Sequence, residues 1–232
     1  FMRPLGHLAD RLKTHSSRVP AAIVGHIGKR LDTQLKLDGR IDDPVWERFR
    51  RYSLKHTAAD EASGLKTQFQ PLWVFGENSL YLAFMCTEPD TAGLKITDAA
   101  RDDRGILNND GVEILIETQT HSYYQIAFDA AGILYDSDWQ GGVDDAWDSG
   151  ATVKTYVGDG FWSAEIRIPR SRPGHDNAKG VVGRVPQRAA PWYINIMRRR
   201  FRGGEVQKFV FSPIGEAGFH EINTFGKLHR PN

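Results

Sequence analysis

Residues Asn108–Asp129 constrain the fold most, because their pattern predicts two antiparallel strands joined by a short polar turn. In the first strand, the aliphatic residues at 112, 114 and 116 alternate with Glu113, Leu115 and Glu117. Successive side chains of a strand point to opposite faces of its sheet, so the even-numbered face is predicted to be core. Glu113 then lies on the other face, where Gln125 of the return strand can join it. A carboxylate and an amide on neighbouring strands would form a polar platform.

The rest of the chain repeats this pattern of short strands. Fewer than 20 residues separate most of them, and no helical pattern of ten or more residues intervenes. This spacing predicts an all-β fold, an antiparallel β-sandwich. A short helix is expected near residues 43–49, where Pro44 follows an aspartate that can cap the first turn.

The chain divides unevenly. Residues 1–33 are basic with weak periodicity, which predicts an N-terminal extension or linker; within it, VPAAIVGHIGK could instead add an edge strand. Residues 34–232 are predicted to form one domain. No signal-peptide pattern is visible at Phe1, so the chain could be a processed protein or a module of a larger one.

Charge, hydropathy and the absence of known motifs argue against several partners and chemistries. The net charge of +1 gives no general attraction to nucleic acid, and no apolar run reaches the length that spans a membrane. Cys86, the single cysteine, lies in an apolar run and is expected to be a buried thiol. The sequence contains no nucleophile elbow, no HExxH motif, no P-loop and no GxGxxG motif after a strand, so no enzymatic activity is predicted.

Seven segments, taken in order, resemble carbohydrate-binding module family 9 and the wider DOMON-like group of β-sandwiches. The resemblance covers the chain from about Leu35 to its end. The segments are LDGRIDDPVW (37–46), LWVFGENSLYLAF (72–84), NDGVEILIE (109–117), YYQIAFDAAG (123–132), FWSAEIRIP (161–169), WYINIMR (192–198) and NTFGKL (223–228).

This resemblance implies a non-catalytic module that binds a sugar and is attached to a polysaccharide-degrading enzyme. In such modules two tryptophans clamp a sugar ring, and carboxylate, amide and arginine side chains bind its hydroxyl groups. Carried over to this sequence, these polar roles fall on Glu113, Gln125 and Asn195. The two clamp positions fall near Leu107 and Phe219, so the sugar site is either rebuilt or lost.

Four other residues are candidates for a rebuilt site. Trp139 and Trp147 lie in an acidic, glycine-rich loop and could replace the clamp, or they could plug the open end of the sandwich. Arg199 shares a strand face with Asn195 and could bind an acidic or sulfated glycan, or the arginines at 198–202 could form ion pairs. His220, next to Phe219, could bind a hydroxyl group or be an ordinary surface residue.

The same acidic loop could hold calcium. Family 9 modules often use calcium to brace loops, and clustered aspartates supply the oxygen ligands that calcium prefers. The candidate ligands are Asp136, Asp138, Asp144 and Asp145, and the alternative is a solvated acidic turn.

The sequence leaves three functions open. The first is a carbohydrate-binding module that targets an associated polysaccharide-active protein to a poly- or oligosaccharide, in an extracellular or periplasmic setting. The second is a structural domain of a larger protein that has lost sugar binding. The third is a DOMON-type haem domain for electron transfer, with axial ligands chosen from Met85, Met197, His121, His175 and His220; sugar binding is the favoured hypothesis.

Overall fold

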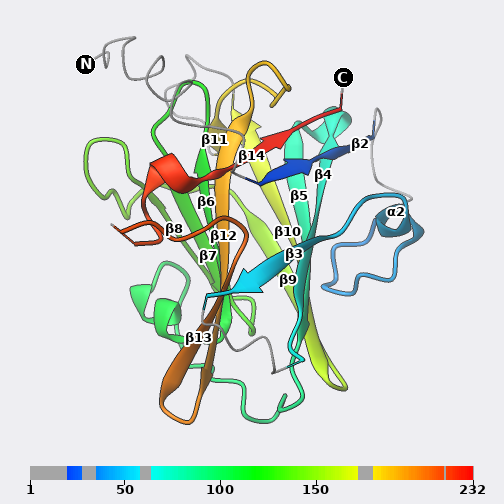
Figure 1. Cartoon of the computed structure of the whole chain (residues 1–232), viewed down its shortest axis with the longest axis vertical. Helices are drawn as coiled ribbons and strands as arrows, with labels where there is room; N and C mark the ends of the chain where they lie inside the picture. The colour runs from blue at the N-terminus through cyan, green and yellow to red at the C-terminus, as the bar shows by residue number, and fades with distance from the viewer. Residues whose placement is uncertain (1–19, 28–34, 58–63, 172–179, 217, 232) are drawn as a thin grey trace.

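The computed structural model describes residues 20–27, 35–57, 64–171, 180–216 and 218–231. The strands in these residues form two facing layers (Figure 1). The first layer contains β2 (Gly25–Ile27), β4 (Thr67–Val74), β5 (Ser79–Thr87), β9 (Thr152–Gly158), β10 (Phe161–Ser171) and β11 (Val181–Val182). The second contains β1 (Ala21–Ile23), β6 (Gly111–Glu117), β7 (Tyr124–Asp129), β8 (Leu134–Asp138), β12 (Trp192–Arg202), β13 (Glu205–Val210) and β14 (Gly226–His229).

One strand joins the two layers. β3 (Tyr52–His56) pairs with β4 of the first layer and with β13 of the second, both antiparallel. Every pairing among β4, β5, β9 and β10, and among β6, β7, β8, β12 and β13, is antiparallel. The predicted antiparallel β-sandwich is therefore confirmed.

The main hydrophobic core fills the space between the layers. Val112, Ile114 and Ile116 of β6 are fully buried in this core, which also contains residues of β4, β5 and β10. The prediction that the aliphatic face of residues 111–117 lies in the core is therefore confirmed. Cys86 is also part of this core, and burial raises the pKa of its thiol to about 11, as expected for an inert buried cysteine.

A second, smaller apolar cluster covers the outer face of the first layer. It is built around α2 (Pro44–Glu47), the helix expected near 43–49, whose Trp46 is 1% exposed. Proline occupies the start of the helix, as predicted. The indole N–H of Trp46 donates to Oε1 of Glu165 on β10, which fixes the helix on the sheet.

Part of the N-terminal extension belongs to the sandwich. β1 pairs with β14, and β2 pairs with β4, each in parallel. The added-strand interpretation of this segment is therefore confirmed for Ala21–Ile27, whereas residues 1–19 and 28–34 lie outside the described residues. A domain boundary near residue 34 stays a prediction.

The structure contains a single short α-helix in its described part. No helix within these residues is long and apolar enough to cross a membrane.

Candidate functional site

The polar platform predicted from the sequence lies on the face of the second layer that points away from the main core. β6 lies between β7 and β12, so odd-numbered residues of all three strands share this face. Nε2 of Gln125 donates a 2.8 Å hydrogen bond to Oε1 of Glu113. The predicted pairing of carboxylate and amide is therefore present.

Arg199 completes the polar centre of the platform. Its Nη1 lies 2.6 Å from Oε2 of Glu113, and both side chains are almost fully buried. Burial lowers the pKa of the Arg199 guanidinium, although the carboxylates of Glu113 and Asp129 act in the opposite direction. Nε and Nη2 of Arg199 are buried and have no hydrogen-bond partner among the described residues. Such donors are costly unless a water or a ligand satisfies them.

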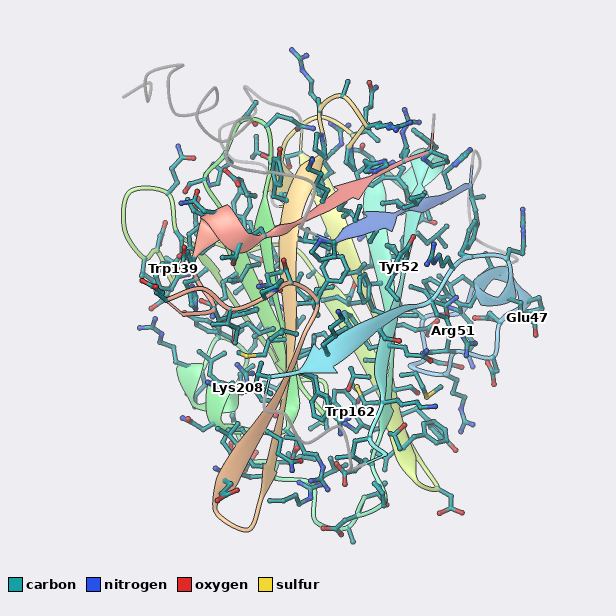
Figure 2. The ribbon with its side chains drawn as sticks, viewed as in Figure 1. Glu47, Arg51, Tyr52, Trp139, Trp162 and Lys208 are labelled. Carbon is teal, nitrogen blue, oxygen red and sulfur yellow. The ribbon has the colours of Figure 1, made fainter. Side chains whose placement is uncertain are left out.

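The indole ring of Trp139 lies beside the polar centre formed by Glu113, Gln125 and Arg199. Its indole N–H contacts Oε1 of Gln125 at 2.9 Å and Oγ of Ser137 at 3.0 Å. Its ring packs nearly parallel to that of Tyr123, with centroids 5.5 Å apart. The side chain is half-buried at the periphery of the molecule, beside the segment that leads from β13 to β14 (Figure 2). A fixed, partly exposed indole next to a carboxylate can stack on an apolar ring face.

His220 and Phe219 close the platform from the β13–β14 segment. Nε2 of His220 lies 3.4 Å from Oε1 of Glu113, and its Nδ1 is 3.3 Å from the hydroxyl oxygen of Tyr123. The His220 ring is 4.6 Å from that of Trp139. Phe219, in contrast, is 8% exposed and packs in an apolar cluster with Leu115 and other residues.

Two residues of this site were not singled out from the sequence. Tyr123 precedes β7, and burial together with the charge of Glu113 raises its pKa to about 12. Ser137 on β8 hydrogen-bonds to Gln125. Tyr123 is an odd-numbered aromatic residue beside Gln125, so the alternation of the strand could have placed it on the platform.

Asn195 lies on the expected strand but serves the fold. It is fully buried, its Nδ2 donates to the carbonyl of Ser212, and its Oδ1 accepts from the backbone N–H groups of Ser212 and Ile196. These bonds attach β12 to the chain that follows β13. The amide is therefore already engaged, and its predicted contact with a sugar gains no support.

Trp147 is not brought to the platform. Its ring stacks on Tyr124, with centroids 4.5 Å apart, and Tyr124 stacks in turn on His121 at 4.1 Å. Tyr124 belongs to the main core, on the opposite face of β7 from Gln125. The geometry thus agrees with the alternative that Trp147 plugs the sandwich.

Leu107, at one clamp position of the family, also packs against protein. It is half-buried in a cluster with Ile106, Ala127 and Tyr135. Ala127 is the cross-strand partner of Glu113, so this cluster adjoins the platform. Both clamp positions, Leu107 and Phe219, therefore contribute apolar packing.

The neighbouring arginines form ion pairs away from the platform. Arg198, Arg200 and Arg202 all contact Glu88, whose side chain is fully buried. Arg202 also pairs with Asp110 at 2.7 Å. The ion-pair alternative is therefore confirmed for these three residues, and Arg199 is likewise paired, with Glu113. Among the described residues, this run offers no unpaired cation for an acidic glycan.

The four aspartates proposed as calcium ligands have separate partners. Asp136 pairs with Arg101, Asp138 contacts His121 at 2.7 Å, and Asp145 accepts a hydrogen bond from the Tyr135 hydroxyl. Asp144 accepts from the backbone of Ala146. In the described part of the chain, no three His, Cys, Asp or Glu side chains are grouped so that they could hold a metal ion. This arrangement does not fit a calcium site built from the four residues.

The haem hypothesis gains no geometric support from the histidines that the structure describes. His121 and His220 both face carboxylates, while His175 lies outside the described residues. Met197 is buried in the cluster that contains Phe219, and Met85 is half-buried on β5.

Comparison with known structures supports the resemblance at the level of the fold. No model of a known family matches the sequence, and no curated protein matches it at a significant level. A family 9 carbohydrate-binding module from Caldicellulosiruptor kristjanssonii, solved with glucose, is 12% identical, with a TM-score of 0.61 over 91% of this chain and 96% of that one. The same kind of module from that organism was solved with cellotriose and is 13% identical, with a TM-score of 0.61 over 90% and 94%.

A third structure is similar over its whole length. It is a candidate carbohydrate-binding protein from Bacteroides uniformis ATCC 8492, 15% identical, with a TM-score of 0.66 over 92% of this chain and 100% of that one. The chain therefore has the fold of family 9 carbohydrate-binding modules, as the seven sequence segments predicted.

Proposed function

We propose that this domain is a non-catalytic carbohydrate-binding module and that the platform on the second layer holds the sugar. One observation carries the proposal: Trp139, Gln125 and Glu113 form a continuous hydrogen-bonded line beside a half-exposed aromatic face. The similarity in fold to modules solved with glucose and cellotriose supports it.

Aromatic stacking would supply most of the contact area. One face of a pyranose ring carries mainly C–H groups, which pack against an indole ring. The two hydrogen bonds from Nε1 of Trp139 hold this ring in one orientation before the sugar arrives. Less side-chain entropy is then lost on binding, which improves affinity.

The polar centre would select the sugar by its hydroxyl groups. The carboxylate of Glu113 accepts hydrogen bonds, and the second N–H of the Gln125 amide can donate one. Nε and Nη2 of Arg199, which have no partner in the described part of the chain, are further donors. A hydroxyl or ring oxygen of the sugar, or a water that bridges to it, would satisfy them. A ligand that pairs these groups removes a desolvation cost that the free domain carries.

The charge of the platform favours a neutral sugar over an acidic one. Glu113 neutralises Arg199 at 2.6 Å, and the Asp129 carboxylate acts on the same guanidinium. Arg198, Arg200 and Arg202 are occupied by Glu88. A uronate or sulfate group on the sugar would meet the Glu113 carboxylate, and none of these four arginines is left unpaired to balance the added charge.

Such a module would act by targeting. Weak binding to a polymer keeps an attached or neighbouring catalytic domain near its substrate by raising the effective concentration. Because polymeric glycans lie outside the cell, the proposed setting is extracellular or periplasmic.

A structural role is the second candidate, and it too has an observation in its favour. Phe219 is 8% exposed, and Leu107 packs against Ile106 and Tyr135, so neither clamp position presents an open aromatic face. If Trp139 does not replace the clamp, the domain would serve as a brace within a larger protein.

Affinity electrophoresis separates the two candidates. The full chain is run through gels that contain a neutral β-glucan, a uronate polymer or no polymer. Retardation by the neutral polymer is expected, with loss of retardation in Glu113→Gln. Glu205→Gln, a change at an exposed residue of β13, is the matched control and should behave like the unchanged protein. Absence of retardation by any polymer would favour the structural role.

A further inference from the structure

The imidazole of His220 makes the contacts that a bound sugar would make. Its ring packs against that of Trp139 in a tilted arrangement, with centroids 4.6 Å apart and an angle of 39° between the planes. Its Nε2 lies 3.4 Å from Oε1 of Glu113, and its Nδ1 is hydrogen-bonded to the hydroxyl of Tyr123 at 3.3 Å. A flat ring with polar atoms on its edge, set against an indole and a carboxylate, matches the geometry of a sugar on an aromatic platform.

We infer that His220 is an internal substitute for the sugar and must leave the platform before a glycan can stack on Trp139. The inference rests on the proposed function. Tyr123 packs along Trp139 as well, with centroids 5.5 Å apart, so the indole is contacted by two aromatic side chains. Of these two side chains, His220 is the one that can move out into solvent, because 34% of its side chain is already exposed.

His220 can leave the platform by a movement of its side chain alone, because the neighbouring Phe219 holds the backbone in place. Phe219 is buried among Leu115, Tyr123 and Met197 and anchors the backbone beside the platform. Rotation of His220 about its own side-chain bonds would uncover the indole without unpacking this anchor. Departure breaks the ring contacts of His220 with Trp139 and Tyr123, its hydrogen bond to the Tyr123 hydroxyl and its contact with Glu113. The bound sugar must replace these contacts.

The two nitrogen positions also specify the ligand. One polar group of the sugar must reach Oε1 of Glu113 and a second must reach the Tyr123 hydroxyl, both from the edge of one ring. Two adjacent hydroxyl groups of a pyranose meet this requirement. A sugar that lacks one of the two hydroxyls would leave a polar group unpaired and bind more weakly.

Isothermal titration of the full chain with cellotriose tests the inference. His220→Ala should bind about three- to tenfold more tightly, the factor that corresponds to the loss of one competing aromatic contact. His26→Ala is the matched control, since His26 is an exposed histidine on β2, in the other layer, and should leave the affinity unchanged. Equal or weaker binding by His220→Ala would overturn the inference and make His220 a direct sugar contact or a bystander.

A measurement without sugar tests whether His220 covers Trp139, independently of whether the domain binds a glycan. Acrylamide quenching of tryptophan fluorescence should increase in His220→Ala, and the increase should vanish when Trp139→Phe is added. If quenching increases but neither protein binds any glycan, His220 does cover Trp139 and the sugar-binding function fails. If quenching does not increase, the covering role of His220 fails whatever the glycan result.

Discussion

The side-chain amide of Gln125 donates a 2.8 Å hydrogen bond across the β6–β7 pair to the carboxylate of Glu113. This bond is the middle link of a chain that runs from the Trp139 indole through Gln125 and Glu113 to the Arg199 guanidinium. An aromatic face, a carboxylate and a buried cation are thereby fixed relative to one another. A preorganised arrangement of this kind is what a binding site needs and what a merely stable sheet does not.

Breaking the Glu113–Arg199 pair should destabilise the domain. Both side chains are about 95% buried, so Arg199→Met leaves the Glu113 carboxylate without its cation. A loss of about 3–5 kcal/mol in the free energy of unfolding is expected, as measured by urea denaturation. The double variant Glu113→Gln with Arg199→Met should lose clearly less than the sum of the two single changes. Additive losses would show that the two groups are not coupled.

Substitution of Glu88 should also lower the stability of the domain. Its fully buried carboxylate contacts Arg198, Arg200 and Arg202, and Arg198 is itself fully buried. Glu88→Gln removes the shared counter-charge and should cost about 3 kcal/mol or more in unfolding free energy. The exposed Glu205→Gln should stay within about 0.5 kcal/mol of the unchanged protein. A similar small effect at Glu88 would mean that the three arginines find other partners.

The platform could be predicted from the sequence because strand alternation has a strict period. If residues 111–117 form a strand, Glu113 must point to the face opposite Val112 and Ile114, and the hairpin brings Gln125 to the same face as Glu113. The same reasoning places Arg199 on the face of its strand that Asn195 shares. It could not identify Glu88 as the partner of Arg198, because the two are 110 residues apart and nothing local specifies that contact.

The sequence also could not predict which of the two tryptophans of the acidic loop, Trp139 or Trp147, reaches the platform. Both have polar and glycine neighbours, so local composition does not distinguish them. The indole N–H of Trp139 donates to Gln125 of β7, which holds Trp139 at the platform. Trp147 instead stacks on Tyr124, whose side chain is on the core face of β7. The fold around the loop, and not the loop sequence, decides which indole reaches the platform.

Stability should decrease as the pH rises towards neutrality, because of Glu165. Burial raises the pKa of this carboxyl from 4.5 to about 7, although it accepts hydrogen bonds from Trp46 and from the backbone of Gly39 and Asp38. The folded state therefore binds the proton more tightly than the unfolded chain. The protonated Glu165 therefore contributes about 3 kcal/mol of stability, which is present below about pH 4.5 and is lost as the pH rises to about 7.

Glu165→Gln tests this dependence, since the amide does not titrate. Melting curves between about pH 4.5 and pH 7.5 should show a smaller decrease in melting temperature for Glu165→Gln than for the unchanged protein. Parallel curves for the two proteins would assign the pH dependence to other groups.

Calcium should have little effect on stability. Asp136, Asp138 and Asp145 already contact Arg101, His121 and Tyr135, respectively, so a calcium ion would have to displace these partners. Melting temperatures with calcium and with EDTA are expected to differ by less than about 1 °C, since a ligand that binds the folded state tightly would raise the melting temperature. A clear increase with calcium would revive the sequence-based hypothesis of a calcium-braced loop.

The proposed sugar site depends on Trp139 in the role that the family gives to the clamp tryptophans, whose positions fall near Leu107 and Phe219 here. The most direct measurement compares the affinity for cellotriose, by isothermal titration, of the unchanged protein, Trp139→Phe and Trp147→Phe. Trp139→Phe removes the indole N–H that binds Gln125 and narrows the stacking face, so its affinity should decrease about tenfold. Trp147→Phe changes a ring that stacks on Tyr124 and should bind like the unchanged protein. Equal binding by Trp139→Phe, or a loss confined to Trp147→Phe, would contradict this account of the site.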